Sequence, residues 1–310
     1  MTEVVTGMDG SGTTAAGPAP AAPSAAEPSV ARISNWSEIR ARFLANKLAV
    51  FGLLIVVILL LVAVFAPLIA PADPLHQDLM NTLKEPSSKH WLGTDALGRD
   101  QLSRIIYGSR IAMIVGLASI LLACFIGITL GAIAGYFGRI WDTLIMRVAD
   151  VFFAFPLLVG AIVIILLMGR GVLPVVISLG IFSWATFARL LRSQILSVRE
   201  MDYVHAAKAL GASRRRIVLK HILPNSVTSV VVYAASSVGI AIVAEASLSF
   251  LGVGVSPEVA EWGNMIFAGK DFMGVKDYLW VYPSLSIVTT ALGFVFLGNG
   301  LRDALDPKLR

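Results

Sequence analysis

Residues 48–69 form an almost unbroken apolar run, and this run constrains the fold of the chain more than any other feature. A helix of this length, rising 1.5 Å per residue, crosses the roughly 30 Å hydrocarbon core of a bilayer. Five further apolar stretches of similar character lie at residues 111–135, 148–168, 172–190, 225–250 and 278–300. Only 15% of the residues are charged, whereas soluble domains carry about 25%. The sequence therefore predicts an all-α, multi-pass protein of the cell membrane with six transmembrane helices.

Composition divides the chain into segments around these spans. Residues 1–35 are rich in Ala, Pro, Gly and Ser and too poor in large apolar residues to fold, which predicts a disordered cytoplasmic tail. Residues 36–109 combine a short basic amphipathic helix, the first span and a polar outer loop. Residues 110–302 hold the other five spans, and residues 303–310 form a second tail. Most of the 25 lysines and arginines fall at the proposed inner ends, which places both termini in the cytoplasm.

Small residues and one proline bear on how the predicted helices pack. Glycines recur every four residues in the second stretch, with one more further upstream, at Gly116, Gly127, Gly131 and Gly135. Such spacing lets transmembrane helices approach closely. In the third stretch Pro156 predicts a kink. Residues 138–146, which precede that stretch, are expected to form a short inner connection.

The longest polar interruption in the second half of the chain is the loop at residues 196–224, between the fourth and fifth spans. Ala206 and Ala207 are adjacent small residues on a short predicted helix, and small residues allow a helix to dock closely into a groove of another protein. Gly211 suits the left-handed backbone that ends such a helix. Pro224 suits the first turn of the next helix. The residues alone leave an ordinary connecting loop equally open.

This loop resembles the EAA loop of ABC importer permeases. The pattern of that loop is Glu-Ala-Ala, a glycine four positions after the second alanine, and a terminal Leu-Pro, although His205 stands here in place of the glutamate. In that family the loop forms a coupling helix that enters a cleft of the ATPase subunit. The resemblance implies an ATPase-coupling role for Tyr203, Ala206, Ala207, Gly211, Ala212, Leu223 and Pro224.

A second segment, HWLGTDALGRDQLSR at residues 90–104, resembles the outer loop of dipeptide and oligopeptide permeases of the DppC/OppC type. The resemblance implies a type I ABC importer permease fold, with one accessory N-terminal span and a five-helix core. Asp95 and Arg99 are spaced i,i+4, as are Asp100 and Arg104, so each pair would meet on a helix. These four residues are candidates for an outer-loop interface, and a solvated helical linker is the alternative.

The sequence carries no catalytic constellation and no metal-binding motif, and residues 263–271 depart from the phosphate-binding loop in both spacing and terminal residue. The chain is therefore expected to be no enzyme and to need no cofactor of its own. Glu245 lies near the outer end of the fifth span, where an acid is costly. It either belongs to a transport pathway or pairs with an outer-loop cation or a backbone N–H.

Together these features predict the permease subunit of an ATP-driven importer, which forms half of a pathway for di- or oligopeptides. The resemblance implies four kinds of partner: a second homologous permease, two ATP-binding domains that hold ATP and Mg, an extracytoplasmic solute-binding protein, and membrane lipid. Nucleic acid is not expected. The alternative is a stand-alone secondary transporter that uses Glu245 as a proton or cation site. Such a transporter would need repeated broken helices, and the two halves of the sequence show no convincing repeat.

Overall fold

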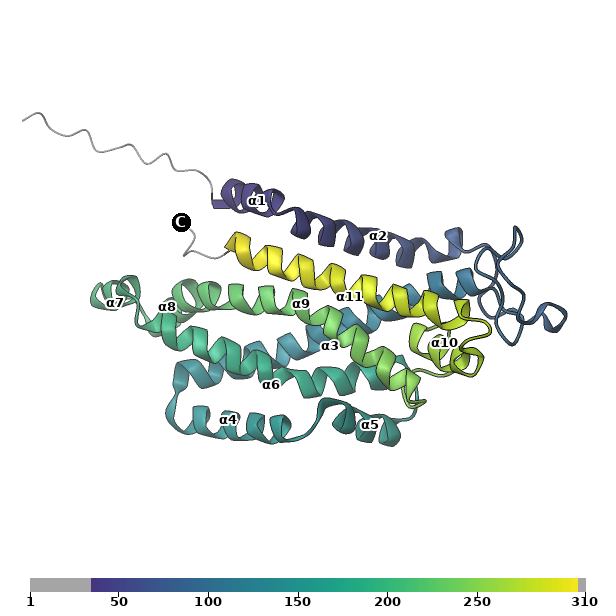
Figure 1. Cartoon of the computed structure of the whole chain (residues 1–310). Coiled ribbons are helices and arrows are strands. Elements are labelled where there is room, and N and C mark those ends of the chain that lie inside the picture. Colours follow the sequence, from purple (N-terminus) through teal and green to yellow (C-terminus); the bar gives the residue numbers. More distant parts are fainter. Residues whose placement is uncertain (1–34, 306–310) are drawn as a thin grey trace, which may run out of the picture.

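The structure, a computed structural model, describes residues 35–305 (Figure 1). Five of its helices are long and apolar enough to cross a membrane. They are α2 (Lys47–Ile69), α3 (Gln101–Phe137), α6 (Val172–Arg199), α9 (Leu223–Phe250) and α11 (Tyr278–Leu305). The expected span at residues 148–168 is a broken pair, α4 (Arg139–Ala154) and α5 (Leu157–Met168), whose axes differ by 91°. The described residues thus hold six apolar spans if the pair counts as one.

Two helices begin earlier than the apolar stretches predicted, because their first turns are polar. Residues 138–146 are not a connection, since all but Gly138 belong to the amphipathic helix α4. Helix α3 begins at Gln101, ten residues before the apolar stretch that it contains, so residues 101–109 are helical and not loop. Pro156 stands at the break between α4 and α5, where the preceding residue, Phe155, is extended as a residue before proline must be. The predicted kink is therefore a full break.

Two ion pairs join helix α4 to α6. Asp142 pairs with Arg192, and Asp150 accepts a hydrogen bond of 2.7 Å from Arg189. The Arg189 guanidinium also lies over the ring of Phe153, 4.1 Å from its centroid. These contacts explain why a helix with charged residues along one side packs against the bundle.

The glycine spacing in α3 brings two helix backbones into contact, as predicted. A methyl group placed on Gly131 would come within 2.6 Å of the carbonyl oxygen of Ala188 in α6, and Gly127 and Gly135 face the same helix. Gly116 instead faces Ile242 of α9, where a methyl group would lie 2.7 Å from the side chain. The α3 helix therefore packs between α6 and α9 along glycine-lined faces.

Helix α2 lies at the edge of the bundle, beside α11 (Figure 1). Only 17% of its most apolar window is buried, compared with 44% for α3, α6 and α9. Figure 1 shows α4 and α5 along the opposite side, with α3, α6 and α9 between. This peripheral position agrees with the accessory role expected for the first span.

The short elements gather at the two ends of the bundle. One end carries α1 (Asn35–Ala45), α7 (Asp202–Ala209), α8 (Arg214–Ile217) and the π-helical turn η2 (Val218–Ile222). The other carries η1 (Leu79–Asn81), α10 (Trp262–Gly269) and η3 (Lys270–Phe272). The expected N-terminal tail lies outside the described residues except for its last residue. In the expected C-terminal tail, residues 303–305 continue α11 and the rest lies outside the described residues.

Candidate functional site

Helix α7 projects from the end of the bundle with most of its surface uncovered (Figure 1). Val204 is its buried residue, whereas Tyr203 and Ala206 are exposed and Ala207 is half-buried. Leu210, which ends the helix, is 88% exposed. The free end of α7 therefore presents an apolar side chain to its surroundings. The sequence pattern pointed to the alanines but not to Leu210.

The turn after α7 is a Schellman motif. The Gly211 N–H donates to the Lys208 carbonyl oxygen at 3.0 Å, and the Ala212 N–H donates to the Ala207 carbonyl oxygen at 3.1 Å. Gly211 has a φ of +78°, the left-handed conformation that the sequence predicted. Nothing lies within 4 Å of the position that its Cβ would occupy. Ala212 then packs against the main apolar core, which anchors the turn.

A π-helical turn joins α8 to α9 at Pro224. Proline lacks an N–H and its ring clashes with the carbonyl four residues earlier in a regular helix. Here the Leu223 N–H bonds to the carbonyl of Val218, five residues back, so the turn before the proline is wider. Leu223 and Pro224 thus lie in the first turn of α9, as predicted for the proline.

A polar clasp ties α7 to the start of α9. The Asn225 side-chain amide donates to the His221 carbonyl oxygen at 2.6 Å and to the Tyr203 hydroxyl at 3.2 Å. His205, which replaces the glutamate of the EAA pattern, lies 3.7 Å from Glu200 at the end of α6. These hydrogen bonds link Tyr203 of α7 to the start of α9, so a displacement of α7 would be transmitted to α9. Nothing in the sequence pattern singled out Asn225.

A cavity of about 310 Å³ opens between α3, the α4–α5 break, α6 and α9. Its wall is largely apolar, with six aromatic residues, and it includes the hydroxyl-bearing residues Ser183, Thr186, Tyr233 and Ser237. None of the described residues that line it is charged. The lining comes from four separate parts of the chain, so no local pattern could have predicted it.

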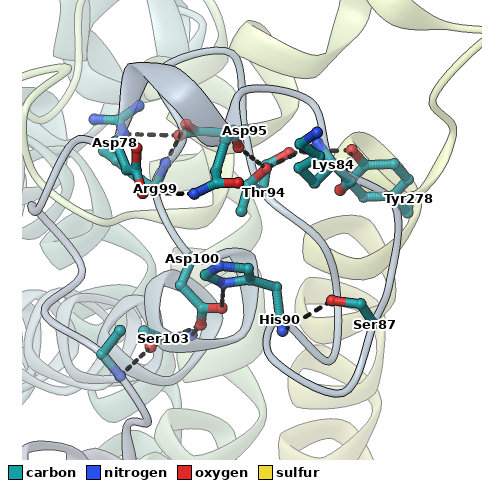
Figure 2. A network of polar contacts seen from close by, with 12 residues as sticks. Asp78, Lys84, Ser87, His90, Thr94, Asp95, Arg99, Asp100, Ser103 and Tyr278 are labelled. Carbon is teal, nitrogen blue, oxygen red and sulfur yellow. Dashed lines mark hydrogen bonds and ion pairs between the residues drawn. The ribbon is translucent and has the colours of Figure 1, made fainter.

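The outer-loop candidates form a buried ion cluster around Asp95. Figure 2 shows Asp95 beside Arg99, whose Nε donates to the Asp95 carboxylate at 2.7 Å. The Nε of Arg104 lies 3.7 Å from the same carboxylate, and an Arg104 Nη donates to the Pro74 carbonyl oxygen. Asp95 and Arg99 are paired as predicted, although they lie in a loop and not on a helix.

The predicted pairing of Asp100 with Arg104 is wrong. Asp100 is the N-cap of α3, and its carboxylate accepts hydrogen bonds of 2.8 Å from the N–H and the hydroxyl of Ser103. The other carboxylate oxygen lies 2.9 Å from His90 Nδ1 (Figure 2). Capping and the histidine satisfy Asp100, so Arg104 turns to Asp95 instead.

The loop after α2 is fastened to the loop that precedes α11. The Tyr278 hydroxyl lies 3.0 Å and 3.1 Å from the carbonyl oxygens of Lys84 and Thr94 (Figure 2). Lys276 donates to the Glu85 carboxylate at 2.7 Å, and this hydrogen bond lowers the pKa of Glu85. These contacts make the two outer loops one surface.

Glu245 lies where the sequence placed it, near the outer end of α9, and is 1% exposed. Neither partner that the sequence suggested is present in the described part of the chain, since no cation forms a salt bridge with Glu245 and no backbone N–H bonds to it. Its partners are the Ser249 hydroxyl, at 3.3 Å, and the side chain of Glu261. Nothing in the sequence pattern pointed to Glu261, which lies 16 residues after Glu245 in a different element.

The arrangement of the helices is that of an ABC importer permease. A chain of the MetNI methionine ABC transporter, solved in inward-facing conformations, matches it with a TM-score of 0.54. The match covers 66% of this chain and 97% of that chain at 16% identity, and it shows the fold.

The family follows from the sequence comparisons. Residues 127–310 match the family described as binding-protein-dependent transport system inner membrane component. Residues 34–86 match the N-terminal TM domain of oligopeptide transport permease C. The chain belongs to this family of ABC transporter permeases and is a multi-pass protein of the inner membrane.

Relatives align over nearly the whole chain. The glutathione transport system permease protein GsiD of Pectobacterium atrosepticum is 44% identical, over 89% of this chain and 92% of its own length. The dipeptide transport system permease protein DppC of Alkalihalophilus pseudofirmus is 41% identical, over 90% and 91%. The oligopeptide transport system permease protein OppC of Bacillus subtilis is 40% identical, over 90% and 91%.

Proposed function

We propose that this permease lines half of the translocation pathway for di- or oligopeptides, and that α7 couples it to a cytoplasmic ATPase. The observation that carries the proposal is the form of α7: an exposed helix that carries three alanines, closed by the Gly211 turn and ending in the exposed side chain of Leu210. Such a helix fits a cleft of limited width. The relatives named above are permeases for dipeptides, oligopeptides and glutathione, which are all peptides.

The proposed transport function requires further subunits beside this chain. A second homologous permease completes the pathway, two ATP-binding domains hold ATP and Mg, and an extracytoplasmic binding protein delivers the peptide to the joined outer loops. Closure of the ATPases moves α7. The clasp of Tyr203 and Asn225 passes that movement to α9, one wall of the cavity.

The cavity suits a peptide of variable sequence. Its aromatic wall accepts apolar side chains, and its hydroxyl groups can bond to peptide N–H and C=O groups. An uncharged wall does not select among side chains of opposite charge. We therefore place selectivity for peptide sequence mainly in the binding protein.

Narrowing this cavity is expected to discriminate by peptide size. Ile240 is 57% exposed in the chain and lines the cavity, so Ile240→Trp adds bulk there without filling the core. In the complete complex, tripeptide uptake is expected to fall about tenfold and dipeptide uptake less, with ATPase activity retained. Uptake of radiolabelled peptides into proteoliposomes measures this.

The control is Val243→Trp on the same helix, because Val243 is 43% exposed and does not line the cavity. An equal loss of uptake in both variants, or no dependence on peptide length, would place the pathway elsewhere.

A further inference from the structure

Two carboxyl groups from separate elements are buried side by side at the outer end of α9. Glu245 and Glu261 are each 1% exposed, and their carboxyl groups lie within hydrogen-bonding reach of each other and of the Ser249 hydroxyl. No lysine or arginine forms a salt bridge with either in the part of the chain that the structure describes. Two adjacent buried carboxyl groups resist ionising together, because no cation paired with them offsets their mutual repulsion and their desolvation.

The surroundings of the two groups differ. The Glu261 carboxylate accepts hydrogen bonds from the N–H groups of Gly263, at 2.5 Å, and Asn264, at 2.8 Å, at the start of α10. A helix N-terminus stabilises an anion. Glu245 has only the Ser249 hydroxyl, which itself accepts a hydrogen bond from the Val255 N–H. The better-stabilised anion is therefore Glu261, and Glu245 is the side of the pair that carries a proton.

We propose that Glu245 and Glu261 share one proton and that Glu245 is a positioning residue, holding α10 against α9 through this hydrogen bond. This role is neither a step in the peptide pathway nor a site for a transported ion. Gly263 packs directly on the backbone of Ala246, so the two acids lie beside a close contact between the two helices.

Helix α10 has other anchors, which make it a link between distant elements. The Trp262 indole N–H donates to the Ile105 carbonyl oxygen of α3 at 3.0 Å, and its ring covers Gly108. The Asn264 amide donates to the carbonyl oxygens of Val255 and Ser256. Loss of the acid pair would free α10 from α9 while these anchors hold it to α3 and to the loop.

The charged groups around the pair set the direction of its pH dependence. Arg104 of α3 acts on Glu261 and favours its anionic form, but its contacts go to Asp95 and to a backbone carbonyl. Asp95 is neutralised in turn by Arg99, and α11 packs along α10, with Leu279 beside Gly269. Burial remains the largest influence and raises the pKa of Glu261 above the ordinary carboxyl value.

A raised carboxyl pKa means that the contact is strongest when a proton is bound. Its contribution to stability is complete below the ordinary carboxyl pKa and is lost as pH rises through the raised value, because the pair then holds two negative charges. A glutamine at residue 245 donates a hydrogen bond at any pH. It should therefore preserve the contact and remove its pH dependence.

The test compares Glu245→Gln, Glu245→Ala and wild type in the assembled complex between about pH 6 and pH 9. Hydrogen exchange of residues 262–269, corrected for the intrinsic effect of pH, reports the attachment of α10. In wild type this exchange is expected to accelerate as pH rises, and in Glu245→Gln to stay slow throughout. In Glu245→Ala it is expected to be about tenfold faster than in wild type near pH 6.

The matched control is Glu258→Gln, an exposed acid of the adjoining loop, which is expected to behave as wild type. If Glu245→Gln resembled Glu245→Ala, or kept the wild-type pH dependence, the shared proton would be refuted. Recovery of wild-type protection at high pH on adding sodium would also overturn it, because a cation would then occupy the pair. Exchange is read without peptide uptake, so this result is independent of the proposed function.

Discussion

The substitution Gly211→Asp is expected to leave the complex assembled in the membrane and to lower peptide uptake and peptide-stimulated ATPase activity by about tenfold or more. Gly211 has a φ of +78° and open space around its Cβ position, so aspartate fits the turn with limited strain. The carboxylate would stand beside Leu210, on the surface proposed to enter the ATPase cleft. Burying an unpaired charge there costs several kcal/mol. The measurement is ATP hydrolysis and uptake by proteoliposomes, with assembly checked by co-purification.

A matched control exists at Gly252, which follows α9 in the same kind of turn, with hydrogen bonds from Gly252 N–H to the Ser249 carbonyl oxygen and from Val253 N–H to the Leu248 carbonyl oxygen. Gly252 also has a φ of +78° and nothing within 4 Å of its Cβ position. Gly252→Asp introduces the same charge and similar backbone strain away from α7, and it is expected to retain uptake. Normal coupled uptake in Gly211→Asp, or equal loss in both variants, would count against α7 as the coupling element.

The substitution Asp95→Asn is expected to be the most destabilising change on the outer face. It removes the one carboxylate that pairs with both Arg99 and Arg104, and the Arg104 side chain is only 2% exposed. Leaving buried cations without a partner costs about 3–5 kcal/mol. The apparent unfolding temperature of the purified protein in detergent is expected to fall by about 10 °C.

The control for this prediction is Asp150→Asn, which breaks another ion pair of the same length. Asp150 and Arg189 are 2.7 Å apart, but their side chains are about half exposed. An exposed pair contributes only about 0–1 kcal/mol, so the unfolding temperature should hardly change. Equal shifts in the two variants would show that burial of the Asp95 cluster is not what makes it stabilising.

The spans were predictable because length and apolar composition are local properties. The sequence placed α2, α6 and α11 closely at their outer ends, and it placed the close approach of α3 to α6 at its glycines. It missed the polar start of α3 and the first half of α4, residues 139–147, as helices, because their hydrophobic pattern is weak or one-sided. Their helical form depends on neighbours, such as the Asp142–Arg192 pair, that no apolar run reveals.

Some features of the candidate site were predictable from local sequence, and others depend on contacts between distant residues. The turn at Gly211 was predictable from local sequence, because a glycine directly after a helix commonly adopts the left-handed conformation that ends it. The error at Asp100 arose because spacing alone cannot show that His90 and the α3 N-terminus compete for its carboxylate. Asn225 and Glu261 could not be found from spacing, because their importance lies in contacts with Tyr203 and Glu245.

The most direct measurement is peptide uptake by proteoliposomes that contain either this chain alone or the full complex of two permeases, ATPases and binding protein. Accumulation is expected only in the full complex and only with ATP, because we propose that the chain supplies half of a pathway and a coupling helix and takes its energy from the ATPases. Uptake by the chain alone, driven by a proton or sodium gradient, would contradict it.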